Sequence, residues 1–361
     1  MRLTVIGTGL MGTSVALAAR ARGDDVAGWD PDPDVLQKAT ARDALEPRPT
    51  IDEAIAGAEL IVVAAPIAHL PATVAAVLEA TTDATVTDVG STKASVVRAA
   101  ESSPRFVGGH PICGSETRGP DAASAQLFEG ATWFLTPVAQ TDPNRHRLVH
   151  TFVSGLGATP VAIDPDAHDR LVAMTSHVPH VLANVVANQT GASRIEGHEP
   201  LVHAGGSLRD MTRIAGANPR IWIDILLDNA DAVRAALQEH RRRIEQVESA
   251  LEQGDAGFIA RWIGEASQNR RRMLEREYPD PGELHRLRVH VPDRPGVLAG
   301  ITQALGADRI NIEDFEMHHV SPERGGTLTL LVGGESEALR AATLLESQGY
   351  SVVVSAVIDA D

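Results

Sequence analysis

The chain has 361 residues, enough for two or three domains, and its 43% hydrophobic and 22% charged residues are typical of a globular protein. The formal net charge of −16 argues against a nucleic-acid partner, because phosphate binding requires a basic face. No stretch approaches the roughly 18 apolar residues of a membrane span. A single cysteine, Cys113, excludes an intrachain disulfide. We therefore expect a cytoplasmic protein without a nucleic-acid or membrane partner.

Residues 1–160 alternate short apolar runs with helical stretches, which predicts an α/β fold with a doubly wound parallel sheet covered on both faces. Helices are expected over segments that include 10–22 and 71–80. The strands are expected at Leu3–Ile6, Val26–Trp29, Leu60–Ala65, Thr85–Val89, Arg105–Val107 and Trp133–Thr136.

Residues 161–279 carry helical patterns throughout and predict an all-α domain. Apolar positions recur every three or four residues from Val233 to Leu251, which indicates a long amphipathic helix that ends at Gly254. Such a helix usually packs against other helices, often those of a second subunit. We therefore expect a homodimer.

A linker rich in proline and glycine at 278–283 precedes a third domain, residues 284–361. Its patterns predict the order β-α-β-β-α-β, which is the ferredoxin-like arrangement. Asp293, Pro295 and Gly296 belong to the turn between the first strand and the first helix of this domain.

A glycine-rich turn follows the first predicted strand. Gly7, Gly9 and Gly12 would allow a tight turn, a close approach of the backbone to a pyrophosphate, and close packing of helix on strand. Asp30, at the end of the next strand, can bind ribose hydroxyls, and the acidic residues just beyond it disfavour a 2′-phosphate. The pattern predicts a Rossmann-type domain that binds NAD rather than NADP. The expected cofactor contacts are Gly7, Thr8, Gly9, Leu10, Met11, Gly12, Asp30 and Pro66.

One histidine, His110, lies in a glycine-rich stretch, 108–119, that we expect to be a loop. Glycines on both sides would give the backbone freedom to present the imidazole to a ligand. Imidazole is the side chain best suited to moving a proton near neutral pH. Ser91 follows the strand Thr85–Val89, at the carboxyl edge of the sheet where such folds bind ligands. Lys93 is expected to offset substrate charge or simply to face solvent.

Together these motifs resemble the prephenate dehydrogenase family, which includes arogenate dehydrogenases, over residues 1 to about 275. Residues from 284 onward resemble an ACT domain, a small module that commonly senses amino acids. The resemblance is carried by GTGLMG at 7–12, DVGSTK at 88–93, GHPICGSE at 109–116, SHVPH at 176–180 and DMTR at 210–213.

The resemblance implies NAD-dependent oxidative decarboxylation of prephenate to 4-hydroxyphenylpyruvate, a step of tyrosine biosynthesis. A hydride leaves ring C4, the C4 hydroxyl loses its proton and carbon dioxide departs as the ring becomes aromatic. His110 would be the base that takes the hydroxyl proton or a hydrogen-bond acceptor for it, and Ser91 would bridge His110 and the substrate. Arg213 would bind a substrate carboxylate through two parallel hydrogen bonds. The other substrate contacts that the resemblance implies are His180, Ser115, Glu116 and Trp222.

Several alternatives remain open. The substrate could be arogenate, or the chain could be a catalytically silent sensor of NAD and tyrosine. A β-hydroxyacid dehydrogenase is disfavoured, because that group relies on a lysine in the helical domain and none follows Lys93. In the ACT-like domain, Asp293, Pro295 and Gly296 match the effector-binding turn, with tyrosine as the expected effector, or the module is purely structural. No metal is expected, because His177 and His180 lack a third ligand.

Overall fold

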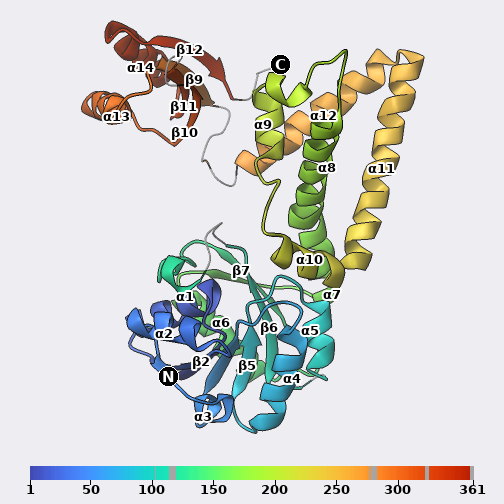
Figure 1. Ribbon diagram of the computed structural model, residues 1–361, viewed down its shortest axis with the longest axis vertical. Helices are drawn as coiled ribbons and strands as arrows, with labels where there is room; N and C mark the ends of the chain where they lie inside the picture. Colours follow the sequence, from blue (N-terminus) through green and yellow to red (C-terminus); the bar gives the residue numbers. More distant parts are fainter. Residues whose placement is uncertain (102, 114–118, 276–277, 279–282, 322–324, 358–361) are drawn as a thin grey trace. The chain divides into compact units, whose positions relative to one another are not determined.

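The computed structural model describes residues 1–101, 103–113, 119–275, 278, 283–321 and 325–357, without the side chains of 318–321. The chain divides into two compact units, Met1–Arg243 and Ile244–Asp361 (Figure 1). In the described part of the chain, no helix is long and apolar enough to cross a membrane.

The first unit contains an eight-stranded sheet with the order β3-β2-β1-β4-β5-β6-β7-β8. Its strands are β1 (Arg2–Ile6), β2 (Asp25–Trp29), β3 (Glu46–Pro47), β4 (Leu60–Val63), β5 (Thr85–Asp88), β6 (Phe106–Pro111), β7 (Thr132–Thr136) and β8 (Thr159–Ala162). β7 runs antiparallel to β6, and β8 runs parallel to β7. The expectation of an all-parallel sheet is therefore wrong at this edge. Parallel pairing needs a crossover, and the described part of the β6–β7 connection holds only the short 3-10 turn Pro120–Ala122.

Alternate side chains along each central strand enter two separate cores, so helices cover both faces of the sheet. Leu3 and Val5 of β1 belong to one core, whereas Ile6 belongs to the other. This confirms the doubly wound architecture. The first core is closed by α1 (Leu10–Ala21), α2 (Pro33–Ala41) and α6 (Pro143–Gly155), and the second by α3 (Ile51–Ile55), α4 (Leu70–Ala80) and α5 (Ala94–Ala99).

Helices follow the sheet, as the sequence predicts. They are α7 (Pro165–Val172), a π-helical turn (Ala173–His177), α8 (Val178–Ala192), the 3-10 turn Pro200–His203, α9 (Gly206–Thr212), α10 (Pro219–Asp228) and α11 (Ala230–Gln253). Gly254, with φ +64°, stands just beyond the end of α11. The predicted apolar stripe is buried at Val233, but Ile244 and Leu251 are 53% and 67% exposed. Among the described residues, the stripe is thus covered more fully along its first part than at Ile244 and Leu251.

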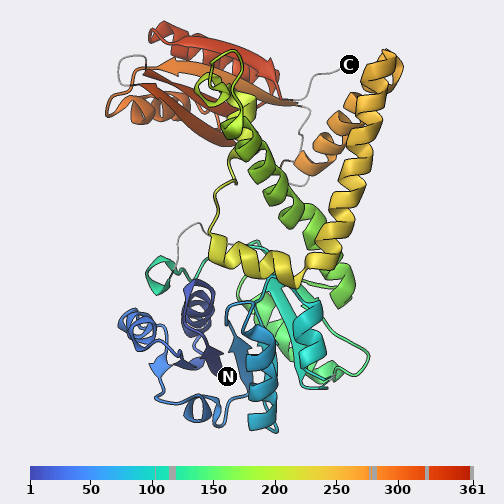
Figure 2. The ribbon, with the colours of Figure 1, turned by 45° about the vertical axis from the view of Figure 1, so that its right-hand side comes forward.

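The second unit continues with α12 (Ala256–Leu274), which follows α11 after a two-residue turn (Figure 2). Beyond it lies a four-stranded antiparallel sheet with the order β10-β11-β9-β12. Its elements are β9 (Leu284–Val291), α13 (Val297–Ala307), β10 (Asp314–Ser321), β11 (Gly325–Gly333), α14 (Glu335–Ser347) and β12 (Ser351–Ala356). Ile301 and Leu345 of the two helices pack on Leu287 and Val289 of β9. The predicted ferredoxin-like order is confirmed.

Candidate active site

Of the three glycines in the turn between β1 and α1, Gly7 and Gly12 have no room for a side chain, whereas Gly9 faces open space. A Cβ on Gly12 would lie 1.9 Å from the carbonyl oxygen of Gly7, so the helix can approach the strand only with glycine there. Gly7 has φ +90°, in the left-handed region that favours glycine. A Cβ on Gly9 would meet no atom within 4 Å. The open space beside Gly9, at a helix start without a side-chain cap, fits a pyrophosphate on the free amides of α1.

Asp30 follows β2 and holds this turn in place. Its Oδ2 accepts hydrogen bonds from the Thr8 amide at 2.6 Å and from the Thr8 hydroxyl at 3.2 Å, while Oδ1 accepts one from the Asp32 amide at 2.9 Å. Thr8 itself is fully buried, so it stabilises the turn. Leu10 and Met11, the other predicted contacts on α1, are partly exposed, and Pro66 is exposed beyond β4.

His110 is the fifth residue of β6, not part of a loop, and this corrects the sequence interpretation. Gly108 and Gly109, which precede it, also lie in the strand. A Cβ on Gly109 would lie 2.5 Å from the Asp88 carbonyl oxygen, and one on Gly108 would lie 2.3 Å from Thr136 Oγ1. These glycines therefore permit a close approach of neighbouring elements, and neither has a positive φ.

Lys93 is fully buried and forms an ion pair with Asp88, which is also fully buried. The expectation that it faces solvent is wrong. Its Nζ also donates a hydrogen bond to the carbonyl of Gly109 at 2.8 Å, and the Gly109 amide donates to Asp88 Oδ1 at 3.0 Å. Burial lowers the pKa of Lys93, an effect that Asp88 opposes. The ion pair thus holds both backbone groups of the residue before His110.

Two residues that sequence reasoning missed, His168 and Asp169 of α7, complete the surroundings of His110. His168 is fully buried, and its Nε2 lies 2.9 Å from His110 Nδ1. On the other side of the ring, His168 Nδ1 lies 2.8 Å from Asp169 Oδ1. The two Asp169 oxygens accept hydrogen bonds from the amides of Lys93 and Ala94, each at 2.8 Å. Because His168 and Asp169 belong to none of the recognised motifs, only the adjacent His-Asp pair at the start of the helical segment hinted at them.

Burial sets the protonation of this group. It lowers the pKa of His110 well below 6.5, and the neighbouring His168, Lys93 and His177 act in the same direction. Burial alone would raise the pKa of Asp169, but hydrogen bonds from His168 and from two backbone amides outweigh it, and the pKa falls. At neutral pH, His110 is therefore a neutral imidazole, with His168 between it and the ionised Asp169. A neutral imidazole can accept a proton.

The π-helical turn before α8 brings His177 and His180 against Trp222 of α10. His180 stacks on the indole with ring centroids 3.7 Å apart, and His177 meets the indole edge at 6.0 Å. His177 Nδ1 lies 3.1 Å from Asn229 Nδ2, which also donates to the Asp169 carbonyl. Burial lowers the pKa of His177 to about 4, so this ring is neutral. Such π turns are frequent at functional sites.

For those remaining predicted site residues that the structure describes, it gives the position in the fold and the burial but no contact with His110. Ser91 lies half-buried after β5 at the carboxyl edge of the sheet. Arg213, just beyond α9, is exposed, and its guanidinium pairs with no group among the described residues. Ser115 and Glu116 lie outside the described residues. Across the described ranges, no three His, Cys, Asp or Glu side chains gather as metal ligands do.

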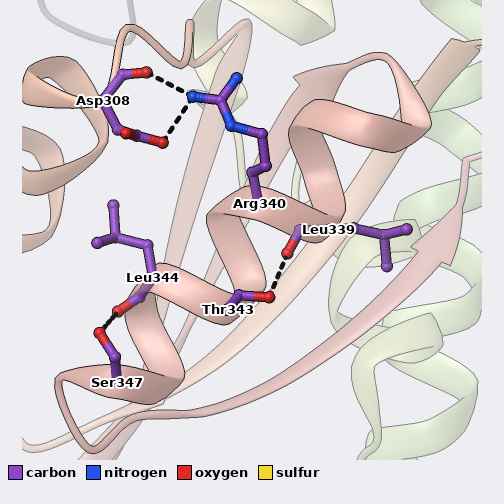
Figure 3. A pocket seen from close by; sticks show the side chains of 6 residues that line it. All are labelled: Asp308, Leu339, Arg340, Thr343, Leu344 and Ser347. Carbon is purple, nitrogen blue, oxygen red and sulfur yellow. Dashed lines mark hydrogen bonds and ion pairs between the residues drawn. The ribbon is translucent and has the colours of Figure 1, made fainter.

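In the second unit, the predicted effector residues Asp293, Pro295 and Gly296 form an exposed turn that leads into α13. A shallow depression on the same unit shares no residue with this turn (Figure 3). Its polar groups are already paired, since Arg340 bonds to Asp308 at 2.7 Å and the Thr343 hydroxyl donates to a carbonyl. The depression is lined by Asp308, Leu339, Arg340, Thr343, Leu344 and Ser347.

Comparison with protein families gives three consecutive matches. Residues 15–162 match the nucleotide-binding domain of prephenate dehydrogenase, residues 164–265 match its dimerization domain, and residues 285–349 match the ACT domain. The prephenate dehydrogenase of Bacillus subtilis is 32% identical over 359 residues, which cover 96% of each chain. The chain belongs to the prephenate dehydrogenase family.

Solved structures of the family share this fold. The prephenate dehydrogenase of Aquifex aeolicus, in complex with hydroxyphenyl propionate and NAD+, superimposes with a TM-score of 0.71 at 26% identity, over 76% of this chain and 98% of that one. The arogenate dehydrogenase of Synechocystis gives a TM-score of 0.68 at 26% identity, over 75% of this chain and 99% of that one. The family therefore contains relatives named for either substrate.

Two glycine substitutions separate the packing role of the turn from its binding role. Gly12→Ala places a methyl group 1.9 Å from a carbonyl oxygen, so we expect it to lower the free energy of unfolding by about 1–3 kcal/mol or more. Gly9→Ala meets open space and should leave stability unchanged, but it should weaken binding of NAD, the cofactor that the sequence predicts. Urea denaturation and NAD titration measure the two effects. Equal NAD affinity in Gly9→Ala and the unmodified protein would contradict a pyrophosphate site at Gly9.

Proposed function

We propose that this protein is an NAD-dependent prephenate dehydrogenase that converts prephenate to 4-hydroxyphenylpyruvate with loss of carbon dioxide. The observation that carries the proposal is the neutral His110 imidazole, held on one side by a buried histidine–aspartate pair, in a chain of this family. The glycine turn and Asp30 supply a cofactor site in the same unit.

The α1 amides beside Gly9, with Asp30, would hold NAD, which would supply the acceptor for the hydride that leaves the substrate ring. His110 takes the proton of the C4 hydroxyl as the hydride leaves and returns it to the same oxygen when carbon dioxide departs and the ring becomes aromatic. This role requires the imidazole to be neutral when substrate binds. The lowered pKa of His110 supports this role. Because aromatisation supplies the driving force, the protein mainly orients the substrate ring and holds one proton until the ring is aromatic.

The substrate carries two carboxylates, and we propose that Arg213 binds one of them. A guanidinium without a protein partner in the described part of the chain is available for a bidentate contact. We assign further substrate contacts to His180 and Trp222, whose rings stack on each other, and to Ser115 and Glu116. Ser91 would bridge His110 and the substrate. The Synechocystis arogenate dehydrogenase structure makes arogenate the second candidate substrate.

We further propose a cytoplasmic homodimer with three domains, residues 1–160, 161–279 and 284–361. The bounds of the three family matches support this division. The exposed Ile244 and Leu251, with Trp262 and Ile263 on α12, leave apolar surface that a second subunit could cover, in a region matched to a dimerization domain. The turn at Asp293, Pro295 and Gly296 would bind tyrosine as a feedback effector.

The proposal is tested by NADH formation with prephenate and with arogenate in parallel, each with and without tyrosine. We expect turnover with prephenate in the unmodified protein. His110→Asn should lower kcat by a factor on the order of 10²–10⁴, because proton transfer from the hydroxyl loses its acceptor. Folded protein that binds NAD but turns over neither substrate would refute the enzyme assignment. Near-normal kcat in His110→Asn would exclude His110 as the proton acceptor.

Arg213→Ala should mainly raise KM for prephenate and leave kcat little changed. A carboxylate contact of equal strength in the ground and transition states contributes to binding and not to the chemical step. Arg209→Ala, one helical turn earlier on α9, is the matched control for loss of positive charge. An unchanged KM in Arg213→Ala would place the carboxylate contact elsewhere.

A further inference from the structure

The contacts between His110, His168 and Asp169 determine which ring nitrogens carry hydrogen. Asp169 is ionised, so its Oδ1 only accepts, and the hydrogen between it and His168 Nδ1, 2.8 Å away, must belong to His168. We take His168 to carry this one ring hydrogen only, and its Nε2 is then unprotonated. That nitrogen lies 2.9 Å from His110 Nδ1, so the hydrogen of this second contact belongs to His110. His110 Nε2 is consequently left with its lone pair.

We propose that His168 and Asp169 are positioning residues that fix the tautomer of His110, so that Nε2 is the free proton acceptor. The inference rests on the proposed function for the identity of the proton donor, the substrate hydroxyl. It does not depend on that function for the tautomer itself, which is a property of the free protein. The other tautomer would present an N–H at Nε2 and could take no proton there.

The packing around His168 keeps this arrangement in place. His168 is fully buried, and Phe134 of β7 meets the edge of its ring with centroids 5.5 Å apart. Asp169 is anchored by the Lys93 and Ala94 amides, and its carbonyl accepts a hydrogen bond from Asn229. Among the described residues, the titratable groups that act on His110 are His168, Lys93 and His177, and the last is neutral. His168 contacts no open surface, so it acts on substrate only through His110.

Two substitutions at His168 separate tautomer control from packing. In His168→Gln, the amide can donate to Asp169 and accept from His110 Nδ1, so we expect most of kcat to remain. His168→Phe keeps an aromatic ring against Phe134 but removes the acceptor, and kcat should fall on the order of 10²-fold with KM little changed. His150→Gln, at an exposed histidine of α6, is the control and should match the unmodified protein. If His168 only fills space, Phe will retain at least as much activity as Gln, and the proposal is then wrong.

The tautomer is measured directly in substrate-free protein labelled with ¹⁵N-histidine. Long-range ¹H–¹⁵N spectra at neutral pH distinguish protonated from unprotonated ring nitrogens, and the signals lost in His110→Asn assign that residue. We expect His110 to carry hydrogen on Nδ1 alone. Hydrogen on Nε2 would overturn the proposal even if every variant folds and turns over. Absence of turnover in the unmodified protein would instead refute the proposed function. The spectra would still show which His110 nitrogen carries hydrogen, and so would still test the tautomer.

Discussion

The buried side chain of Lys93 is the constraint on which the candidate site depends. Its ammonium group pairs with Asp88 and donates to the carbonyl of Gly109, while its own backbone amide donates to Asp169. Asp169 binds His168, which binds His110, the residue after Gly109. These five residues, Lys93, Gly109, His110, His168 and Asp169, close a continuous network that joins β6, α7 and the segment after β5. Removing one partner of a buried ion pair typically costs about 3–5 kcal/mol, because the remaining charge is left buried and uncompensated.

Burying the charged groups of this network costs free energy, but burial also keeps the His110 imidazole neutral. A histidine in water is partly protonated near neutral pH, whereas His110 stays neutral because burial and its neighbours lower its pKa. A fixed, neutral imidazole does not have to reorient when the substrate hydroxyl loses its proton, so no free energy is spent on reorganisation. The open turn at Gly9, the proposed cofactor site, lies in the same compact unit. The packing of β6, α7 and the segment after β5 thus supports both the local fold and the proposed chemistry.

Local patterns predicted much of this molecule. The glycine turn, the alternation of strands and helices, the end of α11 at Gly254 and the βαββαβ order all arise from residues close in sequence. The sequence analysis did not predict that β7 is antiparallel or that β6 extends through His110. Gly108 and Gly109 suggested a loop, whereas they lie in the strand, where any side chain would collide with Asp88 or Thr136. The role of Lys93 was predicted wrongly, and His168 was missed, for a related reason. Lys93 acts on Gly109, 16 residues away, and His168 acts on His110, 58 residues away, distances over which periodicity carries no information.

The pH dependence of kcat/KM for prephenate tests the central claim most directly, because it reports the protonation of groups in the free enzyme. A base is active when neutral, so activity falls as the pH drops through its pKa. With the pKa of His110 held well below 6.5, the acid limb of the profile should lie below pH 6.5, and activity should persist into mildly acidic solution. An acid limb at or above pH 6.5 would contradict a neutral proton acceptor at His110.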